Sequence, residues 1–285
     1  MGITVAIMAQ GTMGAGVAKR LHERGAAVKT LLSGRSEASA GRAKAAGMTP
    51  AADERDLLQG ADYFLSILPP DQAEGLAARL APALQSLATK AVYVDCNAVS
   101  PQTVARIAGI VEPTGAAFVD GGIIGGPPRE GYSPAIYASG AAADRTKPIA
   151  DYGIDWRIID GPVGAASGLK MSYAGITKGT TAIAAAMLLG AARFGCAEAL
   201  IAELSSSQPE MLKRMQRGIP GMYDKAYRWV GEMQEISDFL DANAPSAEMY
   251  RGIARLYDFL AAAEAEGRPA DDNAIKTLER VLGRG

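Results

Sequence analysis

The alternation of short apolar segments with helix-like segments constrains the fold of this chain more than any other feature. Residues 3–9 form a β-branched, apolar run without helical periodicity, which is typical of a strand buried on both faces of a parallel sheet. Comparable runs follow at 28–33, 62–68, 91–95, 116–125, 135–139 and 156–160. They are separated by helix-like stretches near 36–46 and 71–86 and by one that opens at Ser100-Pro101. The pattern predicts a doubly wound, mostly parallel α/β domain over residues 1–160.

The chain changes character after Gly161-Pro162. From Ser167 to Leu204 the residues are mostly Ala, Leu, Met, Ile and Gly, which predicts one long and largely buried helix. Prolines suited to a first helical turn then punctuate the sequence, and they predict helices over 208–218, 220–241, 245–266 and 270–282. We therefore predict an all-α second domain over residues 161–285, joined to the first by the long helix.

Composition excludes several classes of partner. The 29 Lys and Arg residues nearly balance the 31 Asp and Glu residues, so no basic footprint for nucleic acid or an anionic membrane is present. Two cysteines without metal-ligand spacing fit a reducing cytosol and predict no metal site. The uncharged stretch from Gly179 to Ala192 is shorter than the ~20 residues of a membrane span. We expect a soluble, cytoplasmic protein with no nucleic-acid or membrane partner.

The chain contains a single histidine, His22, near the end of an amphipathic helix-like segment where a solvated side chain is expected. A Ser-His-Asp triad, a His-rich zinc site and a dehydrogenase with a histidine acid are therefore excluded. Acid/base chemistry must come from Lys, Tyr, Asp, Glu or Cys.

A variant of the dinucleotide fingerprint G-x-G-x-x-G follows the first predicted strand. It consists of Ala9 and then Gln10, Gly11, Thr12, Met13 and Gly14. In such a strand-turn-helix unit, Gly11 lets the backbone approach a pyrophosphate and Gly14 lets the helix pack on the strand, while the helix N-terminus supplies amide donors. Ala9 replaces the first glycine, and the alternative is an ordinary tight turn. The motif predicts a Rossmann-type dinucleotide site.

The end of the second predicted strand indicates which dinucleotide is bound. About 20 residues after Gly14, NAD enzymes usually place an Asp or Glu on the ribose hydroxyls, but this chain has Ser33, Arg35 and Ser36 there. Arg35 and the two serines can bind a 2′-phosphate. We therefore predict NADP as the cofactor, with NAD less favoured; the alternative for Arg35 is a surface residue that ends a strand.

Several motifs together resemble the β-hydroxyacid dehydrogenases, a superfamily that includes 6-phosphogluconate and 3-hydroxyisobutyrate dehydrogenases. Gly11-Thr12-Met13-Gly14 is similar to the family's G-x-M-G turn, and Leu65 to Pro70, with Leu68 and Pro69, resembles the segment that lines the nicotinamide. Asp95 to Pro101 resembles D-x-S-T-x-x-P, with Asn97 and Ala98 in place of Ser and Thr. The resemblance implies that Asn97 hydrogen-bonds the ribose or the carboxamide.

Two further motifs imply where the substrate binds. The segment Asp120 to Gly125 is similar to the substrate-binding D-A-P-V-S-G, which implicates Gly121, Gly122, Ile124 and Gly125. The segment Gly164 to Lys170 is similar to the G-x-G-x-x-x-K that carries the family's catalytic lysine. The chain looks most like an uncharacterised branch of this superfamily.

The chemistry of Lys170 also follows from its surroundings. A hydride leaves or reaches a carbon only if the attached oxygen loses or gains a proton, so an ionisable group must lie within reach of that oxygen. Lys170 opens a long, nearly uncharged helix, where desolvation favours the neutral amine and allows proton exchange. Tyr173 and Lys178 share its helical face and are candidates for a catalytic contact and a second cation. For all three residues, helix capping or packing is the alternative.

Two departures from the family concern the substrate. The family's Asn four residues after the lysine is Ala174 here, and the Ser of D-A-P-V-S-G is Ile124. Both normally position polar groups, so we expect a substrate that is less polar or bulkier than a small 3-hydroxy acid. Glu232 and Met233 lie where the family brings a Lys-Asp pair, and a solvated helix face is the alternative there.

We predict an NADP-dependent oxidoreductase that interconverts a hydroxyl and a carbonyl on a small molecule, with Lys170 as general acid/base. The apolar helices and the resemblance imply a homodimer. One alternative is an imine reductase, which has a similar architecture but typically carries Asp or Tyr where Lys170 stands. The other is a non-catalytic, NADP-binding sensor or scaffold. The fold alone does not choose a substrate.

Overall fold

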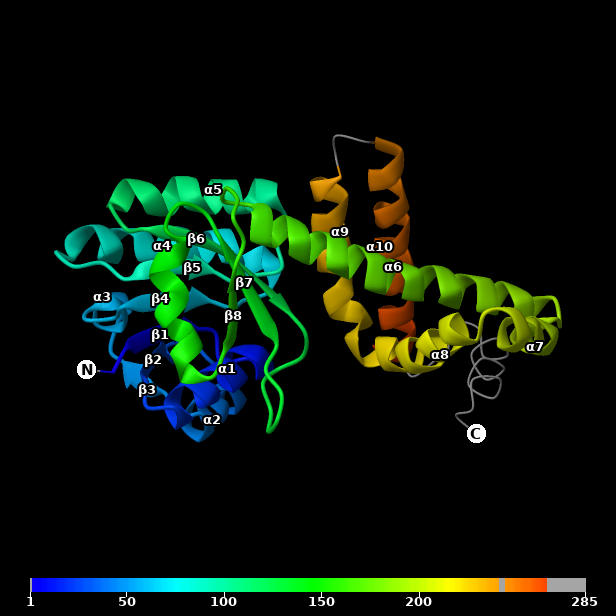
Figure 1. Ribbon diagram of the computed structural model, residues 1–285, viewed down its shortest axis with the longest axis horizontal. Coiled ribbons are helices and arrows are strands. Elements are labelled where there is room, and N and C mark those ends of the chain that lie inside the picture. The colour runs from blue at the N-terminus through cyan, green and yellow to red at the C-terminus, as the bar shows by residue number, and fades with distance from the viewer. Residues whose placement is uncertain (1, 241–243, 266–285) are drawn as a thin grey trace. The chain divides into compact units, whose positions relative to one another are not determined.

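A computed structural model describes residues 2–240 and 244–265 of the chain. The chain divides into two compact units between Met171 and Ser172. Figure 1 shows that the first unit contains the sheet and that the second is helical. The strands and first helices thus occupy the part of the chain in which an α/β domain was predicted.

The first unit is built on an eight-stranded sheet with the order β3-β2-β1-β4-β5-β6-β7-β8. All neighbours pair in parallel except β6 and β7, which pair antiparallel. The strands are β1 (Thr4–Met8), β2 (Ala27–Leu31), β3 (Thr49–Ala51), β4 (Tyr63–Ser66), β5 (Val92–Asp95), β6 (Phe118–Ile124), β7 (Ala135–Ser139) and β8 (Asp155–Ile158). The order, which reverses direction between β1 and β4, confirms the predicted doubly wound, mostly parallel sheet.

Helices cover both faces of this sheet. They are α1 (Thr12–Glu23), α2 (Glu37–Ala45), α3 (Glu54–Leu58), α4 (Pro70–Ser86) and α5 (Pro101–Val111), with 3₁₀ turns η1 (Glu112–Thr114) and η2 (Ala143–Tyr152). Side chains alternate along β1, so that Ala6 and Met8 join the core under α3, α4 and α5. Val5 and Ile7 join the opposite core, under α1, α2 and η2. A strand buried on both faces explains why its sequence is continuously apolar.

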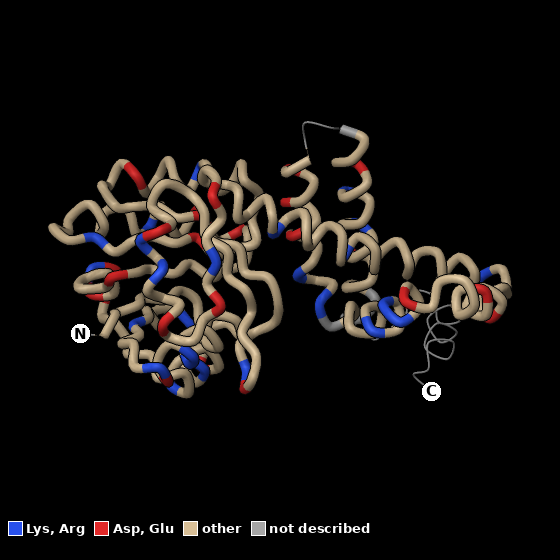
Figure 2. The backbone as a smooth tube through the Cα atoms, in the orientation of Figure 1, with Lys and Arg blue, Asp and Glu red and all other residues tan. Residues whose placement is uncertain are grey.

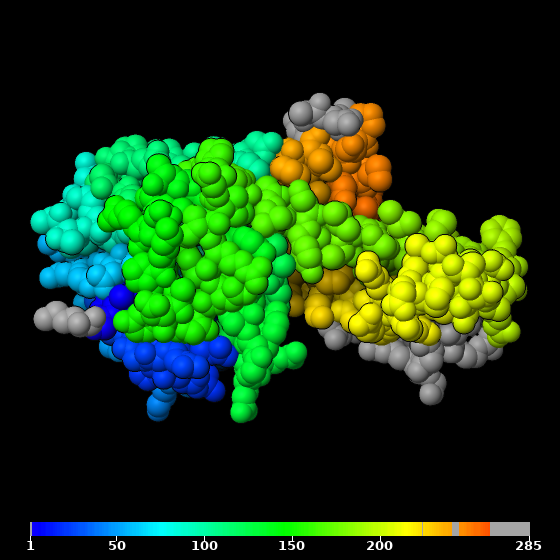
Figure 3. Space-filling view, in the orientation of Figure 1, coloured from blue at the N-terminus to red at the C-terminus, as the bar shows by residue number. Residues whose placement is uncertain are grey.

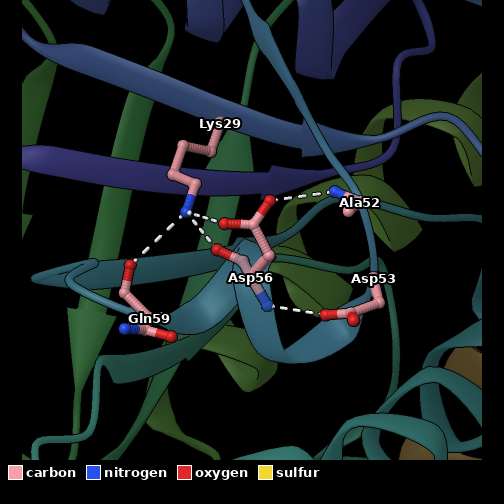
Figure 4. Close-up of polar contacts among 5 residues, drawn as sticks. All are labelled: Lys29, Ala52, Asp53, Asp56 and Gln59. Atoms are coloured by element: carbon pink, nitrogen blue, oxygen red, sulfur yellow. Dashed lines mark hydrogen bonds and ion pairs between the residues drawn. The ribbon is translucent and has the colours of Figure 1, made fainter.

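Strand β3 and helix α3 were not predicted, because both are short and β3 contains Pro50. Polar contacts hold them in place (Figure 4). The Asp56 carboxylate accepts the Ala52 N–H at 2.9 Å and lies 3.3 Å from the Lys29 ammonium. The Ala52 bond and the Lys29 charge lower the pKa of Asp56. Asp53 caps α3 through the Asp56 N–H at 2.8 Å.

The long helix predicted from Ser167 to Leu204 is two helices, so that prediction was wrong at its C-terminal end. Helix α6 (Ala165–Arg193) ends just before Gly195, whose φ of 68° is left-handed, and α7 (Ala197–Ser207) begins after it. The remaining helices are α8 (Pro209–Gly218), η3 (Pro220–Lys225), α9 (Ala226–Phe239) and α10 (Ala244–Ala265). The helix predicted at 270–282 lies outside the described residues.

Within the described ranges, α6 is the one helix long and apolar enough to cross a bilayer. This finding rests on the length and composition of the helix alone, and core helices of water-soluble proteins meet the same criterion. Lys170 and Lys178 interrupt its N-terminal half.

Candidate active site

The predicted site residues follow neighbouring strands at one edge of the sheet. Gly11 follows β1, Leu68 follows β4, Asn97 follows β5, and Ile124 ends β6. These four strands are consecutive and parallel, so their carboxyl ends meet at the same edge. Ligands of doubly wound sheets bind outside this edge, where the strand order reverses. The fold thus gathers the predicted residues of the first unit along one line.

The glycine-rich turn has the shape that a dinucleotide requires. A Cβ atom on Gly14 would lie 1.9 Å from the carbonyl oxygen of Ala9, so only glycine lets α1 start so close to β1. A Cβ on Gly11 would meet no atom within 4 Å. Gly11 and Thr12 are exposed at the start of α1 and Met13 is half-buried, so the first amides of the helix face open space. These residues fit a bound pyrophosphate.

Gln10, also predicted to bind the cofactor, has a fully buried side chain. Its amide nitrogen donates to the Leu31 carbonyl at 2.9 Å and to the Thr30 hydroxyl, both in β2. Its main-chain carbonyl accepts a 2.7 Å bond from Nε of Arg42. The side chain of Gln10 therefore braces the turn, and only its backbone faces a ligand. Sequence reasoning missed Arg42, because a lone arginine on a helix has no motif.

A groove of about 250 Å³ lies beside the end of β2. It is lined by Arg35, Leu68, Gln72, Gly75, Leu76 and Arg79. The structure therefore brings Arg35 and Leu68 together, and Arg79, which the sequence did not single out, joins them. Ser33 and Ser36 are exposed, and the Ser36 hydroxyl caps α2 by accepting the Ser39 N–H at 3.3 Å. Pro69 is exposed at the start of α4.

Asn97 is placed at the predicted edge, but its side chain is bonded inside the protein. Its amide nitrogen donates to Ser66 Oγ and to Asp95, each at 2.8 Å, and its oxygen accepts the Leu68 N–H. Asn97 therefore ties the ends of β4 and β5 together, and its side chain is only 2% exposed. Burial raises the pKa of Asp95 to about 7 in spite of the bonds from Asn97.

Asp120 fixes the start of α6, a role that the sequence did not assign. The fully buried carboxylate accepts the N–H groups of Gly164 and Ser167 at 3.0 Å, the Ser167 hydroxyl at 2.6 Å and the Ser139 hydroxyl at 3.1 Å. A carboxylate at a helix N-terminus is stabilised by the orphan amides and the helix dipole. Asp120 therefore links β6 and β7 to the helix that carries Lys170.

Lys170 lies at the end of β6. Its half-buried ammonium donates to the Ile123 carbonyl at 2.6 Å. A Cβ on Gly122 would lie 2.7 Å from the Ala166 carbonyl, and one on Gly121 would lie 2.8 Å from Cys96 Sγ. The glycine pair thus allows α6 and β5 to pack closely against β6, which brings Lys170 to the edge. Burial raises the pKa of the Cys96 thiol, so this cysteine is kept as an unreactive thiol.

The loop after β6 begins with Ile124, which is half-buried, and the exposed Gly125. Gly125 has a φ of 127°, and a Cβ there would lie 2.2 Å from the Tyr132 hydroxyl. The next amide, Gly126 N–H, donates to that same hydroxyl at 3.2 Å. Glycine is therefore required at position 125 by backbone conformation and by Tyr132.

In the second unit, Lys178 forms an ion pair with Glu232, and both side chains are mostly buried. The Lys178 ammonium also lies 5.2 Å from the ring centre of Trp229. The main-chain carbonyl of Lys178 accepts a 2.7 Å hydrogen bond from the Tyr257 hydroxyl. Burial, and secondarily the Glu232 charge, raises the pKa of Tyr257. The pairing of Lys178 with Glu232 rests on a tertiary contact that periodicity does not reveal.

The other predicted residues of this unit differ in how far they are exposed. Tyr173 is half exposed, whereas Ala174 is 2% exposed. Met233, suggested with Glu232 as a replacement for the family's charged pair, is fully buried and apolar. It belongs to the core of the helical unit.

Comparison with known families agrees with this geometry. Residues 4–151 match the NAD binding domain of 6-phosphogluconate dehydrogenase, and residues 191–260 match a domain of unknown function. Because the first match covers more than half of the chain, the protein belongs to this NAD-binding family, as the motifs predicted.

Two relatives are more than a quarter identical to this chain over the aligned residues. The "uncharacterized 28.5 kDa protein in 7S RNA 5′ region" of Methanothermus fervidus is 28% identical over 214 residues, which are 75% of this chain and 81% of that protein. A solved conserved protein of unknown function, described as structurally similar to 3-hydroxyacid dehydrogenases, is 29% identical with a TM-score of 0.71. That match covers 94% of this chain and 100% of the other.

More distant structures share the fold. The 3-hydroxyisobutyrate dehydrogenase of Mycobacterium tuberculosis, solved with L-serine, is 18% identical, with a TM-score of 0.72 over 98% of this chain and 99% of that one. An imine reductase from Myxococcus stipitatus in complex with NADP⁺ is 18% identical, with a TM-score of 0.59 over 97% and 99%. Family and fold identify the protein as an NAD(P)-dependent dehydrogenase or reductase.

Proposed function

We propose that the protein catalyses NADP-dependent hydride transfer between the nicotinamide and a carbon that carries a hydroxyl or carbonyl group, with Lys170 as general acid/base. The position of the Lys170 ammonium, 2.6 Å from the Ile123 carbonyl at the end of β6, is the observation that supports this most. Three strand spacings of about 4.8 Å separate β6 from β1 and its glycine-rich turn. Gly11 to Gly14 would hold the diphosphate of a dinucleotide, and Lys170 lies at the same edge of the sheet.

Lys170 would supply the proton that hydride transfer requires. The nicotinamide, when bound, would supply the hydride chemistry, and a residue of the chain must protonate or deprotonate the substrate oxygen. In the direction of reduction the Lys170 ammonium donates a proton to the carbonyl oxygen, and in oxidation the neutral amine accepts one from the hydroxyl. The bond to Ile123 restricts the ammonium, so the proton is delivered from a fixed position.

Arg35 supports the choice of NADP. It lines the groove beside β2 together with Arg79, whereas the described residues that line this groove include no carboxylate. A guanidinium forms two parallel hydrogen bonds to a phosphate, such as the 2′-phosphate of NADP. The ribose hydroxyls of NAD, in contrast, would find no carboxylate acceptor among the residues that line this groove. We expect Arg35→Ala to remove the preference for NADPH over NADH.

The substrate we propose is less polar near its reacting carbon than a small 3-hydroxy acid. Ile124 places an apolar, half-buried side chain at the end of β6, and Ala174 has no polar side chain where the family carries Asn. Each missing bond to a small acid would cost roughly 1–3 kcal/mol. Larger alkyl or aryl carbonyl compounds are therefore expected to be turned over with a higher kcat/KM than acids of the size of 3-hydroxyisobutyrate.

We also propose that the chain is a cytoplasmic homodimer that pairs through α6. Exposed residues on this helix recur at alternating steps of four and three positions, which is the spacing of a helix-pairing seam: Leu169, Tyr173, Ile176, Thr180, Ile183 and Met187. Most of α6 is free of charged residues (Figure 2), and its side chains reach the surface (Figure 3). Such an apolar face is its own complement across a two-fold axis.

The experiment that tests the proposed activity follows NADPH oxidation with a panel of aldehydes, ketones, oxo acids and cyclic imines, and NADP⁺ reduction with hydroxy acids. Turnover of C=O compounds is expected. Turnover of imines alone would favour an imine reductase. Tight NADPH binding without turnover of any compound in either direction would favour a sensor or scaffold.

A further inference from the structure

The residue before the glycine-rich turn is held from two sides. On one side the buried amide of Gln10 donates to Leu31 and Thr30 of β2. On the other, Nε of Arg42 donates to the Gln10 carbonyl at 2.7 Å. Nη2 of Arg42 also donates to the Ser39 hydroxyl at 3.0 Å within α2. One exposed arginine thus joins α2 to the turn expected to receive the cofactor.

The bond from Arg42 sets the direction of a neighbouring amide. The Gln10–Gly11 peptide is trans, and the C=O and N–H of a planar trans peptide point in opposite directions. Since the Gln10 carbonyl is directed at Arg42, the Gly11 N–H points away from it. Gly11 is exposed, and a Cβ there would meet no atom within 4 Å, so this amide borders open space at the start of α1.

We propose that Arg42 is a positioning residue for the diphosphate of the dinucleotide. It fixes the Gln10–Gly11 peptide so that the Gly11 N–H is aimed at a diphosphate before the ligand arrives. This inference rests on the proposed dinucleotide site. It assigns Arg42 a task different from that of Arg35, which lines the groove beside β2 and is expected to bind the 2′-phosphate.

The two arginines should therefore differ in the ligands that they affect. Arg42 acts on the diphosphate, which NADPH and NADH share, so its loss should weaken both by the same factor. Arg35 acts on the 2′-phosphate, so its loss should weaken NADPH and 2′-AMP but not NADH. Arg42→Ala should leave 2′-AMP, which has no diphosphate, unchanged.

Isothermal titration calorimetry of the full chain with NADPH, NADH and 2′-AMP tests this difference. For Arg42→Ala we expect about tenfold weaker binding of NADPH and NADH, the usual effect of one hydrogen bond that involves a charge, and binding of 2′-AMP within twofold of wild type. Arg35→Ala is the matched control. Should Arg42→Ala fail to fold, Arg42→Lys keeps the charge but loses the rigid fork, and is expected to weaken both dinucleotides by a smaller factor.

Two results would overturn the inference alone, and a third would overturn the proposed function on which it rests. Unchanged NADH binding by Arg42→Ala would mean that the Gly11 amide needs no support. Weaker binding of all three ligands, together with a lower unfolding temperature, would mean that Arg42 only stabilises α2. If wild type binds none of the three ligands, the proposed function itself fails. If wild type binds them and Arg42→Ala does so equally well, the inference alone fails.

Discussion

Replacing Asp95 with Asn is expected to change how the stability of the first unit depends on pH. The Asp95 side chain is fully buried at the end of β5. Its oxygens accept the Asn97 N–H at 3.0 Å and the Asn97 amide at 2.8 Å. These bonds favour the carboxylate, but burial outweighs them and raises the pKa of Asp95 to about 7 from the ordinary value of 3.8.

The sign and size of the effect follow from that pKa. Below pH 3.8 both folded and unfolded chains carry the proton, so Asp95 does not alter stability. Between that pH and about 7 the unfolded chain loses the proton while the folded chain keeps it, so the free energy of unfolding falls as pH rises. At 1.36 kcal/mol for each pKa unit, the loss is about 4 kcal/mol and stays constant above the folded pKa.

Urea unfolding at intervals from pH 4 to 8 measures this loss. Both proteins should carry Trp229→Phe, so that fluorescence reports on Trp156 in β8 of the first unit. Carboxylates that do not interact with Asp95 contribute equally to both proteins, so the difference between Asp95→Asn and its parent contains only Asp95 and its coupling to neighbours such as Asp120. We expect this difference to shift in favour of the variant by several kcal/mol as pH rises. A difference that stays constant with pH, or shifts the other way, would refute the assigned pKa.

Three further predictions concern the turn, the start of α6 and the surface of α6. Gly14→Ala should destabilise the first unit by about 1–3 kcal/mol in urea unfolding, because its Cβ would lie 1.9 Å from the Ala9 carbonyl oxygen, whereas Gly11→Ala should change stability by less than about 0.5 kcal/mol. Asp120→Ala should cost at least about 3 kcal/mol, since it leaves buried amide and hydroxyl donors without their acceptor, and equal stability would contradict the role of this carboxylate. Ile176→Glu should convert the proposed dimer to a monomer in size-exclusion chromatography with light scattering without loss of helix content, because this side chain is 70% exposed in one chain.

The sequence predicted the parts of the fold that local patterns determine. Strand β1 is buried on both faces, so its sequence is continuously apolar and its type was evident. Helix α5 begins at Pro101 behind the cap Ser100, both of which are local signals. The break after α6 was missed, because Gly195 lies in a stretch as apolar and Ala-rich as the helix itself, and its left-handed φ is not visible in composition.

In the candidate site, too, local motifs could be recognised in the sequence, whereas contacts between distant segments could not. The glycine-rich turn and Lys170 could be proposed from the sequence because each belongs to a motif with a defined spacing along the chain. Arg42 and Arg79 were missed because only the packing of α2 and α4 against the sheet brings them to this edge. Asn97 was expected to face the cofactor, but its side chain bonds to Ser66 and Leu68, which lie about 30 residues earlier in the sequence. Contacts between residues so far apart produce no periodic pattern in the sequence.

The activity of Lys170→Ala tests the central claim most directly. With the best carbonyl substrate from the panel, kcat for NADPH oxidation should fall by about 10²–10⁴, the usual contribution of a general acid/base, while the Kd for NADPH stays within about twofold of wild type. Added primary amines should restore part of the lost rate, because they can occupy the vacated space and donate the proton. Full activity in Lys170→Ala, or a loss explained entirely by weaker NADPH binding, would contradict the assignment of Lys170 as the proton donor.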